Sequence, residues 1–363
     1  MPKTLDSLPA DDGFAMPGEF ERHRRCWLVW PERTEYFRQG AKPAQRALVR
    51  IASAIAQGEP VAVCVSARQF DNAARMLPPQ VQVLELSTDD MWIRDCGPCF
   101  VRNSRGDVRV VDFAFNGWAG LAHGVPVAHQ LDGLIPWKIA QLEGMDRYVC
   151  DLVAEGGNLC SDGQGTLIVT AENLLDPARN TAGRSRQEIE SLLCAHLGAR
   201  KVIWLERGLR YDVTLGHSDN LACFVRPGVV IQTWVDDPAD PQFDVCREVH
   251  EVLAGATDAR GRALEVHRLH QPEQMFVQAE DLDGLDAGPW LDARRVGDPI
   301  AASYVNFYIA NRAIVMPGYG VRDEAARATV QALFPERTVL VVPAREILLG
   351  GGSIHCITQQ QPE

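Results

Sequence analysis

Short runs of β-branched and aromatic residues recur along the whole chain, and each run has the length of a single strand. Gly, Pro, Asn or Asp residues lie at the ends of these runs, as is usual for strands. The pattern predicts strands at residues 27–30, 61–65, 81–86, 108–115, 167–170, 202–205, 221–225, 229–234, 304–309, 313–316 and 339–342.

Between some of these runs the apolar residues recur every three to four positions, which is the period of one helix face. Asp323 and Glu324 stand where a helix N-terminus favours acidic side chains. The polar region 236–298 predicts one helix with peripheral loops. The spacing predicts helices over residues 45–55, 185–197 and 322–334.

Strands and single helices are spread evenly over the sequence, and no Gly/Ser-rich or charge-rich linker divides it. This order favours an α/β fold in which residues 1–363 form a single domain. A repeated strand-strand-helix-strand unit is compatible with the order, although no repeated sequence motif marks one.

Composition and charge narrow the function classes. The 363 residues are 46% hydrophobic and 23% charged, which is typical of a globular protein. The net charge is −12 and there is no Lys/Arg cluster, so we expect no nucleic-acid partner. No apolar segment has the length of a signal peptide or a membrane span. We therefore expect a cytoplasmic protein with reduced cysteines and no membrane contact; a homo-oligomer is compatible with the sequence.

The last fourteen residues carry the most informative chemistry. Three consecutive glycines end at Gly352, four residues before Cys356. Glycine lets the backbone come close to a ligand, so this segment is suited to delivering one thiol as a nucleophile. We expect residues 354–358 to form a strand in which His355 faces away from Cys356. The alternative is a buried structural cysteine, which we favour for Cys64, Cys150, Cys194, Cys223 and Cys246.

A dense group of acids lies in residues 88–98, just after a predicted strand. Asp89, Asp90 and Asp95 share this segment with Trp92. Carboxylates bind a guanidinium in a bidentate manner and an aromatic face adds cation–π attraction, so a cation site is one interpretation. A solvated turn with Asp as the turn former is the other.

Two further segments could supply an acid and a histidine. Glu155 precedes two glycines, which permit close backbone approach to a ligand or simply make a turn. His217 and Asp219 precede a predicted strand, and in extended chain they would point to one side, as a general acid/base and a substrate anchor. Residues 302–311 are expected to be mainly a buried strand.

Metal chemistry is the competing interpretation. His217, Asp219 and Cys356 could together ligate zinc, but no local His-Glu-x-x-His pair supports that arrangement. Cys96 and Cys99 form the only Cys-x-x-Cys pair. Because no second pair exists and a strand is predicted next, neither a zinc site nor a redox motif is expected there.

Four motifs together resemble the agmatine deiminases, which belong to the guanidine-modifying (pentein) superfamily, near the bacterial-type peptidylarginine deiminases. They are WIRDCGP at 92–98, EGG at 155–157, GHSDN at 216–220 and GGGSIHCITQQ at 350–360. The resemblance runs over nearly the whole chain. It implies a five-bladed α/β propeller of pseudo-fivefold strand-strand-helix-strand repeats with the site at its axis. It also implies hydrolysis of a guanidino group to a ureido group with release of ammonia, and no metal or organic cofactor.

The resemblance also implies roles for individual residues. Cys356 matches the nucleophile and His217 the general acid/base. Asp95 and Asp219 match the carboxylates that hold the guanidinium, and Glu155 matches the acid that orients the histidine. Trp92 lies where the family has a substrate-side aromatic; Asp89, Asp90, Asp212 and Gly352 are the further candidates for substrate binding.

The sequence departs from the family pattern next to the histidine motif. Val213 stands where agmatine deiminases usually carry an acid, and Leu215, Ser218 and Asn158 are also unusual. Agmatine, hydrolysed to N-carbamoylputrescine in polyamine metabolism, is the first substrate expected, and another small guanidine with a less cationic tail is the alternative. Asp212 could replace the missing acid if Val213 faces the core. A metal-dependent hydrolase and a non-catalytic guanidine-binding protein are the alternatives from other classes.

Overall fold

The computed structural model describes residues 2–120 and 128–363. Five sheets share one local plan: a strand pairs antiparallel with the next strand, a helix follows, and a third strand returns parallel to the second. The first unit comprises β20 (Gln359–Pro362), β3 (His23–Val29), α1 (Lys42–Ile55) and β4 (Val61–Val65). The second comprises β6 (Cys99–Asn103), β7 (Val108–Ala114), α4 (Ile135–Glu143) and β8 (Arg147–Val153).

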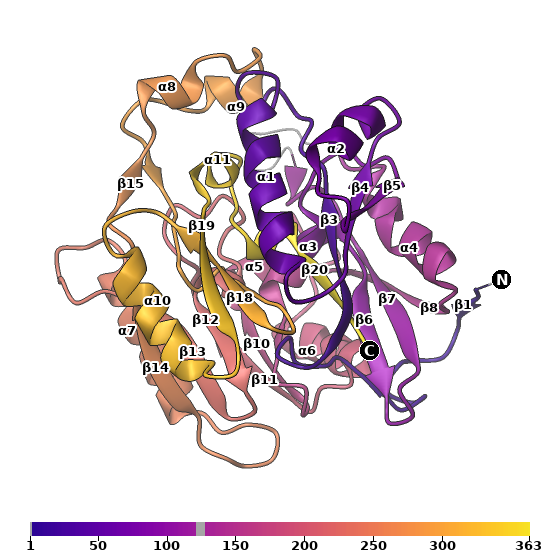
Figure 1. Ribbon diagram of the computed structural model, residues 1–363. Coiled ribbons are helices and arrows are strands. Elements are labelled where there is room, and N and C mark those ends of the chain that lie inside the picture. Colours follow the sequence, from indigo (N-terminus) through magenta and orange to yellow (C-terminus); the bar gives the residue numbers. More distant parts are fainter. Residues whose placement is uncertain (1, 121–127) are drawn as a thin grey trace.

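The remaining three units follow in sequence order (Figure 1). The third comprises β9 (Cys160–Ser161), β10 (Thr166–Thr170), α6 (Arg186–Leu197) and β11 (Lys201–Leu205). The fourth comprises β12 (Ala222–Arg226), β13 (Val229–Trp234), α7 (Phe243–Gly255) and β14 (Glu265–His270). The fifth comprises β17 (Tyr308–Ile309), β18 (Ala313–Gly318), α10 (Asp323–Leu333) and β19 (Thr338–Pro343).

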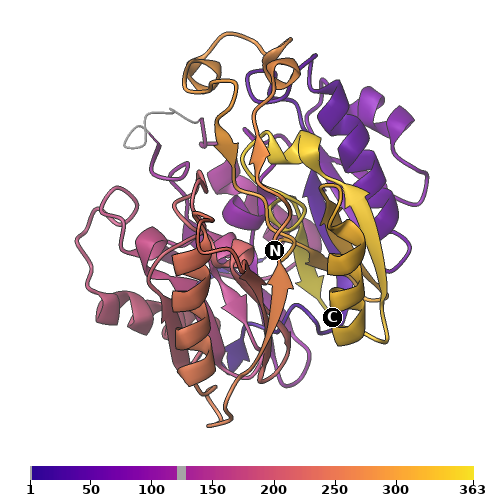
Figure 2. The ribbon, with the colours of Figure 1, turned by 90° about the vertical axis from the view of Figure 1, so that its left-hand side faces the viewer.

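The repeated unit that the sequence left open is therefore present five times, as the pentein fold requires. In Figure 2 the helices lie at the periphery and the strands lie toward the middle. The first unit takes its antiparallel strand, β20, from the C-terminus and its other strands from the N-terminal region. This pairing closes the set of five units and fixes the chain directly after Cys356.

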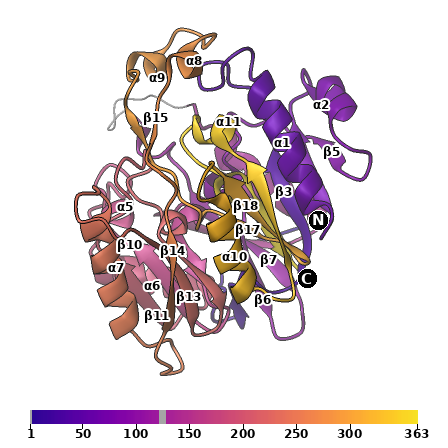
Figure 3. The same cartoon turned by 60° about the vertical axis from the view of Figure 1, so that its left-hand side comes forward.

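Shorter elements extend the units. The strands β1 (Thr4–Leu5) and β2 (Phe14–Ala15) flank the second sheet, and β5 (Gln82–Glu85) extends the first after α2 (Phe70–Met76). Between the fourth and fifth units the strands β15 (Met275–Phe276) and β16 (Pro299–Ile300) pair and carry α8 (Ala279–Leu282) and α9 (Pro289–Asp292). Figure 3 shows this insertion standing at one end of the molecule beside α1. Further short helices include α3 (Ile93–Cys96), α5 (Ala171–Leu174), α11 (Arg345–Leu348) and the 3₁₀ turn at Asp132–Leu134.

The three helices that the periodicity predicted are present as α1, α6 and α10, whereas α2 and α4 were not predicted. In α1 the buried residues recur at three-to-four spacing, including Ala44, Leu48, Ile51 and Ile55, and this face packs into the core. Ser185 caps α6 through a reciprocal capping box with Glu188. Among the described residues no helix is long and apolar enough to cross a membrane.

Three local predictions were wrong. Residues 354–358 form a 3₁₀ turn at His355–Ile357 instead of a strand, and strand β20 begins only at Gln359. The expected strand at 304–309 is reduced to Tyr308–Ile309, although the segment is buried. The region 236–298 contains strands as well as helices, including the six-residue strand β14.

All ten cysteines are free, and Cys194 and Cys223 are only partly buried.

Candidate active site

The candidate catalytic residues lie in the equivalent position of each unit, the turn directly before the antiparallel strand. These turns come together in space: α3 contacts the turns Gly156–Asn158 and His355–Ile357, the turn Gly156–Asn158 contacts the turn Ser218–Asn220, and Asn306 contacts Cys356. The second unit contributes α3 (Ile93–Cys96), the third the turn Gly156–Asn158, the fourth the turn Ser218–Asn220, the fifth residues 303–307 and the first the turn His355–Ile357.

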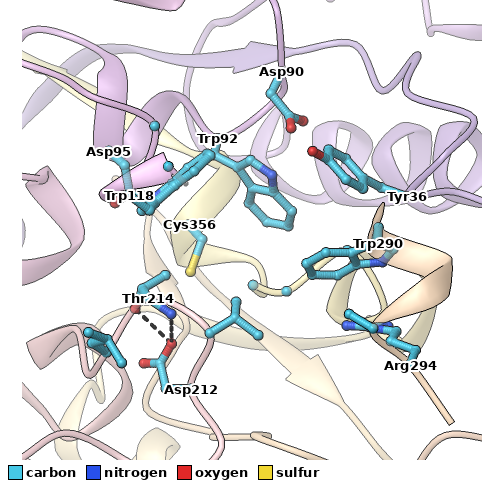
Figure 4. Close-up of a pocket in the computed structure, with 18 residues that line it drawn as sticks. Tyr36, Asp90, Trp92, Asp95, Trp118, Asp212, Thr214, Trp290, Arg294 and Cys356 are labelled. Atoms are coloured by element: carbon cyan, nitrogen blue, oxygen red, sulfur yellow. Dashed lines mark hydrogen bonds between the residues drawn. The ribbon is translucent and has the colours of Figure 1, made fainter. Parts of the chain in front are cut away.

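A cavity of about 390 Å³ opens over these turns (Figure 4). Its volume is in the range of sites for small molecules. The Cys356 sulfur points into it, as does the Asp95 carboxylate. Four aromatic side chains and the three consecutive glycines form much of the wall; they are Tyr36, Trp92, Trp118, Trp290 and Gly350–Gly352.

Cys356 is held by polar neighbours. The Asn306 side-chain amide donates to Sγ at 3.2 Å, and Asp219 Oδ2 lies 3.6 Å from Sγ. Burial raises the pKa of the Cys356 thiol well above its usual value, and the charges of Asp219 and Asp95 raise it further. The thiol is therefore neutral in the empty site, and a bound cation would favour the thiolate by offsetting those two charges.

His217 is completely buried behind the cavity, next to Glu155. Its Nε2 lies 2.7 Å from Glu155 Oε2, and its Nδ1 lies 3.5 Å from Asp95 Oδ1 without forming a hydrogen bond. Burial disfavours the imidazolium, but Asp95 and then Glu155 outweigh it and raise the His217 pKa to about 10. The ring is therefore protonated near neutrality and can act as an acid.

Glu155 is held in turn by Arg179, whose Nε donates to Oε1 at 2.8 Å. Burial alone would raise the pKa of Glu155, but Arg179 and His217 together lower it to about 2. The Asn173 amide also donates to Oε2, at 2.8 Å. Glu155 is thus a fixed anion that orients the histidine ring.

Two carboxylates flank the thiol. Asp95 accepts hydrogen bonds from the Trp118 indole at 2.9 Å and the Gly157 amide at 3.1 Å. Burial, opposed by His217, raises its pKa to about 6. Asp219 Oδ2 accepts from His355 Nδ1 at 2.8 Å, whereas its buried Oδ1 has no hydrogen-bond partner. An unpartnered carboxylate oxygen beside a thiol is suited to a guanidinium N–H.

Close packing explains the glycines after Glu155. A Cβ on Gly156 would lie 2.2 Å from the Arg94 carbonyl oxygen. A Cβ on Gly157 would lie 2.5 Å from His217 Nδ1, 2.7 Å from Asp95 Oδ1 and 3.2 Å from Asp219 Oδ2. Only glycine leaves room for these three polar groups to converge, so the glycines are needed for close approach to protein side chains, and a plain turn does not account for them.

The remaining expected substrate residues are placed differently from one another. Trp92, Asp90 and Gly352 line the cavity. Asp89 lies outside the cavity lining, because its carboxylate accepts the Leu131 amide at 2.6 Å. Asp212 lines the cavity, but its oxygens accept four hydrogen bonds from Thr214, His217 and Asn220. Asp212 therefore holds its loop together and is not free to replace a missing acid.

Val213 faces the cavity and is 49% exposed, so the alternative that it faces the core is wrong. Leu215 holds a φ of 59°, in the left-handed region that apolar residues seldom adopt. Asn158 and Ser218 are fully buried and bond to each other, since the Ser218 amide donates to Asn158 Oδ1 at 3.2 Å. Asn158 and Ser218, which depart from the family pattern, therefore affect the buried packing around the site and do not form part of the cavity wall.

Sequence reasoning missed two members of the site. Asn306 contacts Cys356, yet its segment was expected to be a plain strand; its place in the repeat is the signal that could have found it. His355 was expected to face away from Cys356 in a strand. The chain forms a turn there, and the His355 ring bridges Asp219 and Glu19, with Nε2 2.7 Å from Glu19 Oε2.

Metal coordination has no support in this geometry. His217, Asp219 and Cys356 do not form the expected ligand set: within residues 2–120 and 128–363, no three His, Cys, Asp or Glu side chains are grouped to hold an ion. His217 instead has its nitrogens directed at Glu155 and Asp95.

Comparisons with known proteins agree with this geometry. The model of the Porphyromonas-type peptidyl-arginine deiminase family matches residues 15–362. The chain is 48% identical to the agmatine deiminase of Ectopseudomonas mendocina, covering 99% of this chain and 98% of that one. It is also 48% identical to a putative agmatine deiminase of Listeria monocytogenes, over 99% of each chain.

Solved structures give the same result. The agmatine deiminase of Enterococcus faecalis superimposes with a TM-score of 0.95 and 40% identity over 100% of both chains. A putative arginine deiminase of Porphyromonas gingivalis superimposes with a TM-score of 0.83 and 30% identity, over 96% of this chain and 98% of that one. With nearly its full length matched by the family model and by these relatives, the chain belongs to the Porphyromonas-type peptidyl-arginine deiminase family.

Proposed function

We propose that this protein hydrolyses the guanidino group of a small molecule to a ureido group and releases ammonia, with Cys356 as the nucleophile. Agmatine, the substrate named for its relatives, is the first candidate. The carrying observation is one thiol in a small cavity, beside the two buried carboxylates Asp95 and Asp219, of which Asp219 keeps one oxygen without a hydrogen-bond partner.

The first half of the reaction forms a covalent intermediate. Asp95 and Asp219 bind the guanidinium, and Trp92 lines the same wall, so the central carbon is held near Sγ. The thiol loses its proton to solvent as the substrate cation offsets the two carboxylates. The thiolate adds to the carbon, the His217 imidazolium protonates the departing nitrogen, and the C–N bond breaks. Ammonia leaves and an S-alkylthiouronium remains.

The second half restores the enzyme. His217, now neutral, takes a proton from water, and the hydroxide adds to the thiouronium carbon. The C–S bond then breaks, the remaining hydroxyl proton passes to the sulfur, and the ureido product forms. Glu155 holds the ring in place throughout, anchored by Arg179.

All five units contribute a residue to this chemistry, which supports a single catalytic domain over residues 1–363. The partner proposed is a small molecule with a cationic guanidino group, acting without nucleic acid or membrane. The ten free cysteines are compatible with a cytoplasmic location.

Steady-state assays of ammonia and ureide release from agmatine, arginine, peptidyl-arginine and shorter guanidino compounds test the proposal. Cys356→Ser must abolish turnover and leave the melting temperature near that of wild type, whereas Cys194→Ser is the matched control and must remain active. Retained turnover in Cys356→Ser refutes the mechanism.

Chelation separates the enzyme classes. A cysteine hydrolase survives EDTA but is inactivated by a thiol alkylator, and substrate protects it. A metal-dependent hydrolase loses activity with the chelator. A guanidine-binding protein without catalysis releases ammonia from none of the compounds.

A further inference from the structure

The wall of the cavity away from Cys356 is built from α9, the turn after it and the Val213 loop. A Cβ on Gly351 would lie 2.9 Å from Val213 Cγ2 and 3.4 Å from the Trp290 ring. A Cβ on the next residue, Gly352, would lie 3.1 Å from the Cys356 sulfur. Successive Cα atoms are only about 3.8 Å apart, so a short substrate tail lying along these glycines reaches Val213 and Trp290.

Arg294 brings a positive charge to this wall. Its Nη1 donates to the Leu349 carbonyl at 2.6 Å, and its guanidinium lies 4.2 Å from the Trp290 ring centroid. Within the described parts of the chain no carboxylate forms an ion pair with it. Burial lowers the Arg294 pKa to about 10, and the more distant Asp281 and Asp298 offset only part of that effect. The group remains a cation at neutral pH.

Trp290 offers a second donor on the same wall. Its indole Nε1–H is buried and has no hydrogen-bond partner. In Figure 4 Trp290 and Arg294 lie together on one side of the cavity. A buried donor left unpaired is unfavourable, and a carboxylate can accept from an indole N–H and a guanidinium together.

One acid in the cavity, Asp90, favours an ammonium on the substrate tail instead of a carboxylate. Asp90 is buried, and its Oδ2 has no hydrogen-bond partner, so it is the group that would attract an ammonium. Burial, opposed by Arg33, raises the Asp90 pKa to about 7. Its carboxyl is therefore partly protonated near neutrality, whereas Arg294 keeps its full charge.

We propose that Arg294 and Trp290 bind a carboxylate on the substrate tail, so that small ω-guanidino carboxylates are preferred over agmatine. Val213 fits this preference, because an acid at that position would repel the tail. The inference rests on the proposed deiminase function and names the substrate class of the same site.

The test compares kcat/KM for 4-guanidinobutyrate, 3-guanidinopropionate, agmatine and uncharged-tail butylguanidine. Wild type should favour a guanidino carboxylate over agmatine. Arg294→Gln should lower kcat/KM for that compound by roughly ten- to a hundredfold, the value of one charge-assisted contact, and change butylguanidine by no more than about twofold. The neighbouring exposed Arg295→Gln is the matched control and should leave every ratio unchanged.

Val213→Glu provides a test that does not depend on Arg294→Gln folding. Its new carboxylate should compete for Arg294, lower guanidino-carboxylate turnover and raise that of agmatine. The proposal is overturned if wild type favours agmatine over both guanidino carboxylates, or if Arg294→Gln or Val213→Glu changes all substrates equally. Failure to hydrolyse any guanidine would instead refute the proposed function.

Discussion

Replacing Gly157 with alanine would put one methyl group at the point where the polar groups that we propose to be catalytic converge. The new Cβ would stand 2.5 Å from His217 Nδ1 and 2.7 Å from Asp95 Oδ1, whereas ordinary contact begins near 3.4 Å. Both groups must then retreat by about 0.7–0.9 Å. They are buried and tied to Glu155 and Trp118, so they cannot move independently.

A displacement of about 1 Å at a reacting group costs roughly a hundredfold in rate. We therefore expect Gly157→Ala to lower kcat/KM for ureide formation about a hundredfold, with a melting temperature within a few degrees of wild type. Gly255→Ala is the matched control, because nothing lies within 4 Å of its added Cβ. Activity of Gly157→Ala within threefold of wild type would show that these contacts do not set the reaction geometry.

Three further results are expected. Because the His217 pKa is about 10, activity should fall as the pH rises through that value. Glu155→Gln should move this alkaline limb of the pH–rate profile down by about one to two pH units, since one charge-assisted hydrogen bond to His217 is lost. An alkaline limb that does not move would contradict the assignment of His217 as the acid. Because the Cys356 thiol pKa is raised, alkylation of the empty enzyme by iodoacetamide should be slow at pH 7 and accelerate above pH 9, and a rate independent of pH would refute this. Leu48→Ala should lower the free energy of unfolding, measured by urea denaturation, by about 2–5 kcal/mol, because Leu48 is fully buried. Val321→Ala, at an 86% exposed position, should change it by less than about 0.5 kcal/mol. Equal effects of the two substitutions would contradict the burial argument.

Strong periodicity made the regular elements predictable. The strand at 61–65 and the strand at 229–234 have the predicted bounds, because both runs are rich in valine or other β-branched residues and every position is buried. The helix at 185–197 begins at its capping serine, as expected from the sequence. Strand β14 was missed because five of its six side chains are exposed or only partly buried, so its sequence EVHRLH carries little apolar signal.

The site was less accessible to local reasoning because its residues occupy turns. His355 and Cys356 look like part of a strand, since isoleucine and threonine surround them. The structure forms a 3₁₀ turn there, because β20 must pair with β3 and the chain has to reach that edge. Asn306 carried no motif of its own. Only its equivalence to the other four turns identifies it, and that equivalence appears in the pairing of strands and not in repeated letters.

The charges in the site affect both the proposed reaction and the choice of substrate. Before substrate binds, burial and the charges of Asp219 and Asp95 raise the pKa of the Cys356 thiol and keep it protonated, while Asp95 and Glu155 keep His217 charged. In the proposed mechanism a guanidinium supplies the cation that offsets these carboxylates, so the thiolate forms next to an acid that is already protonated. If Arg294 binds the substrate tail as proposed, it also repels a second cation there, so the cavity selects a positive head and disfavours a doubly charged substrate.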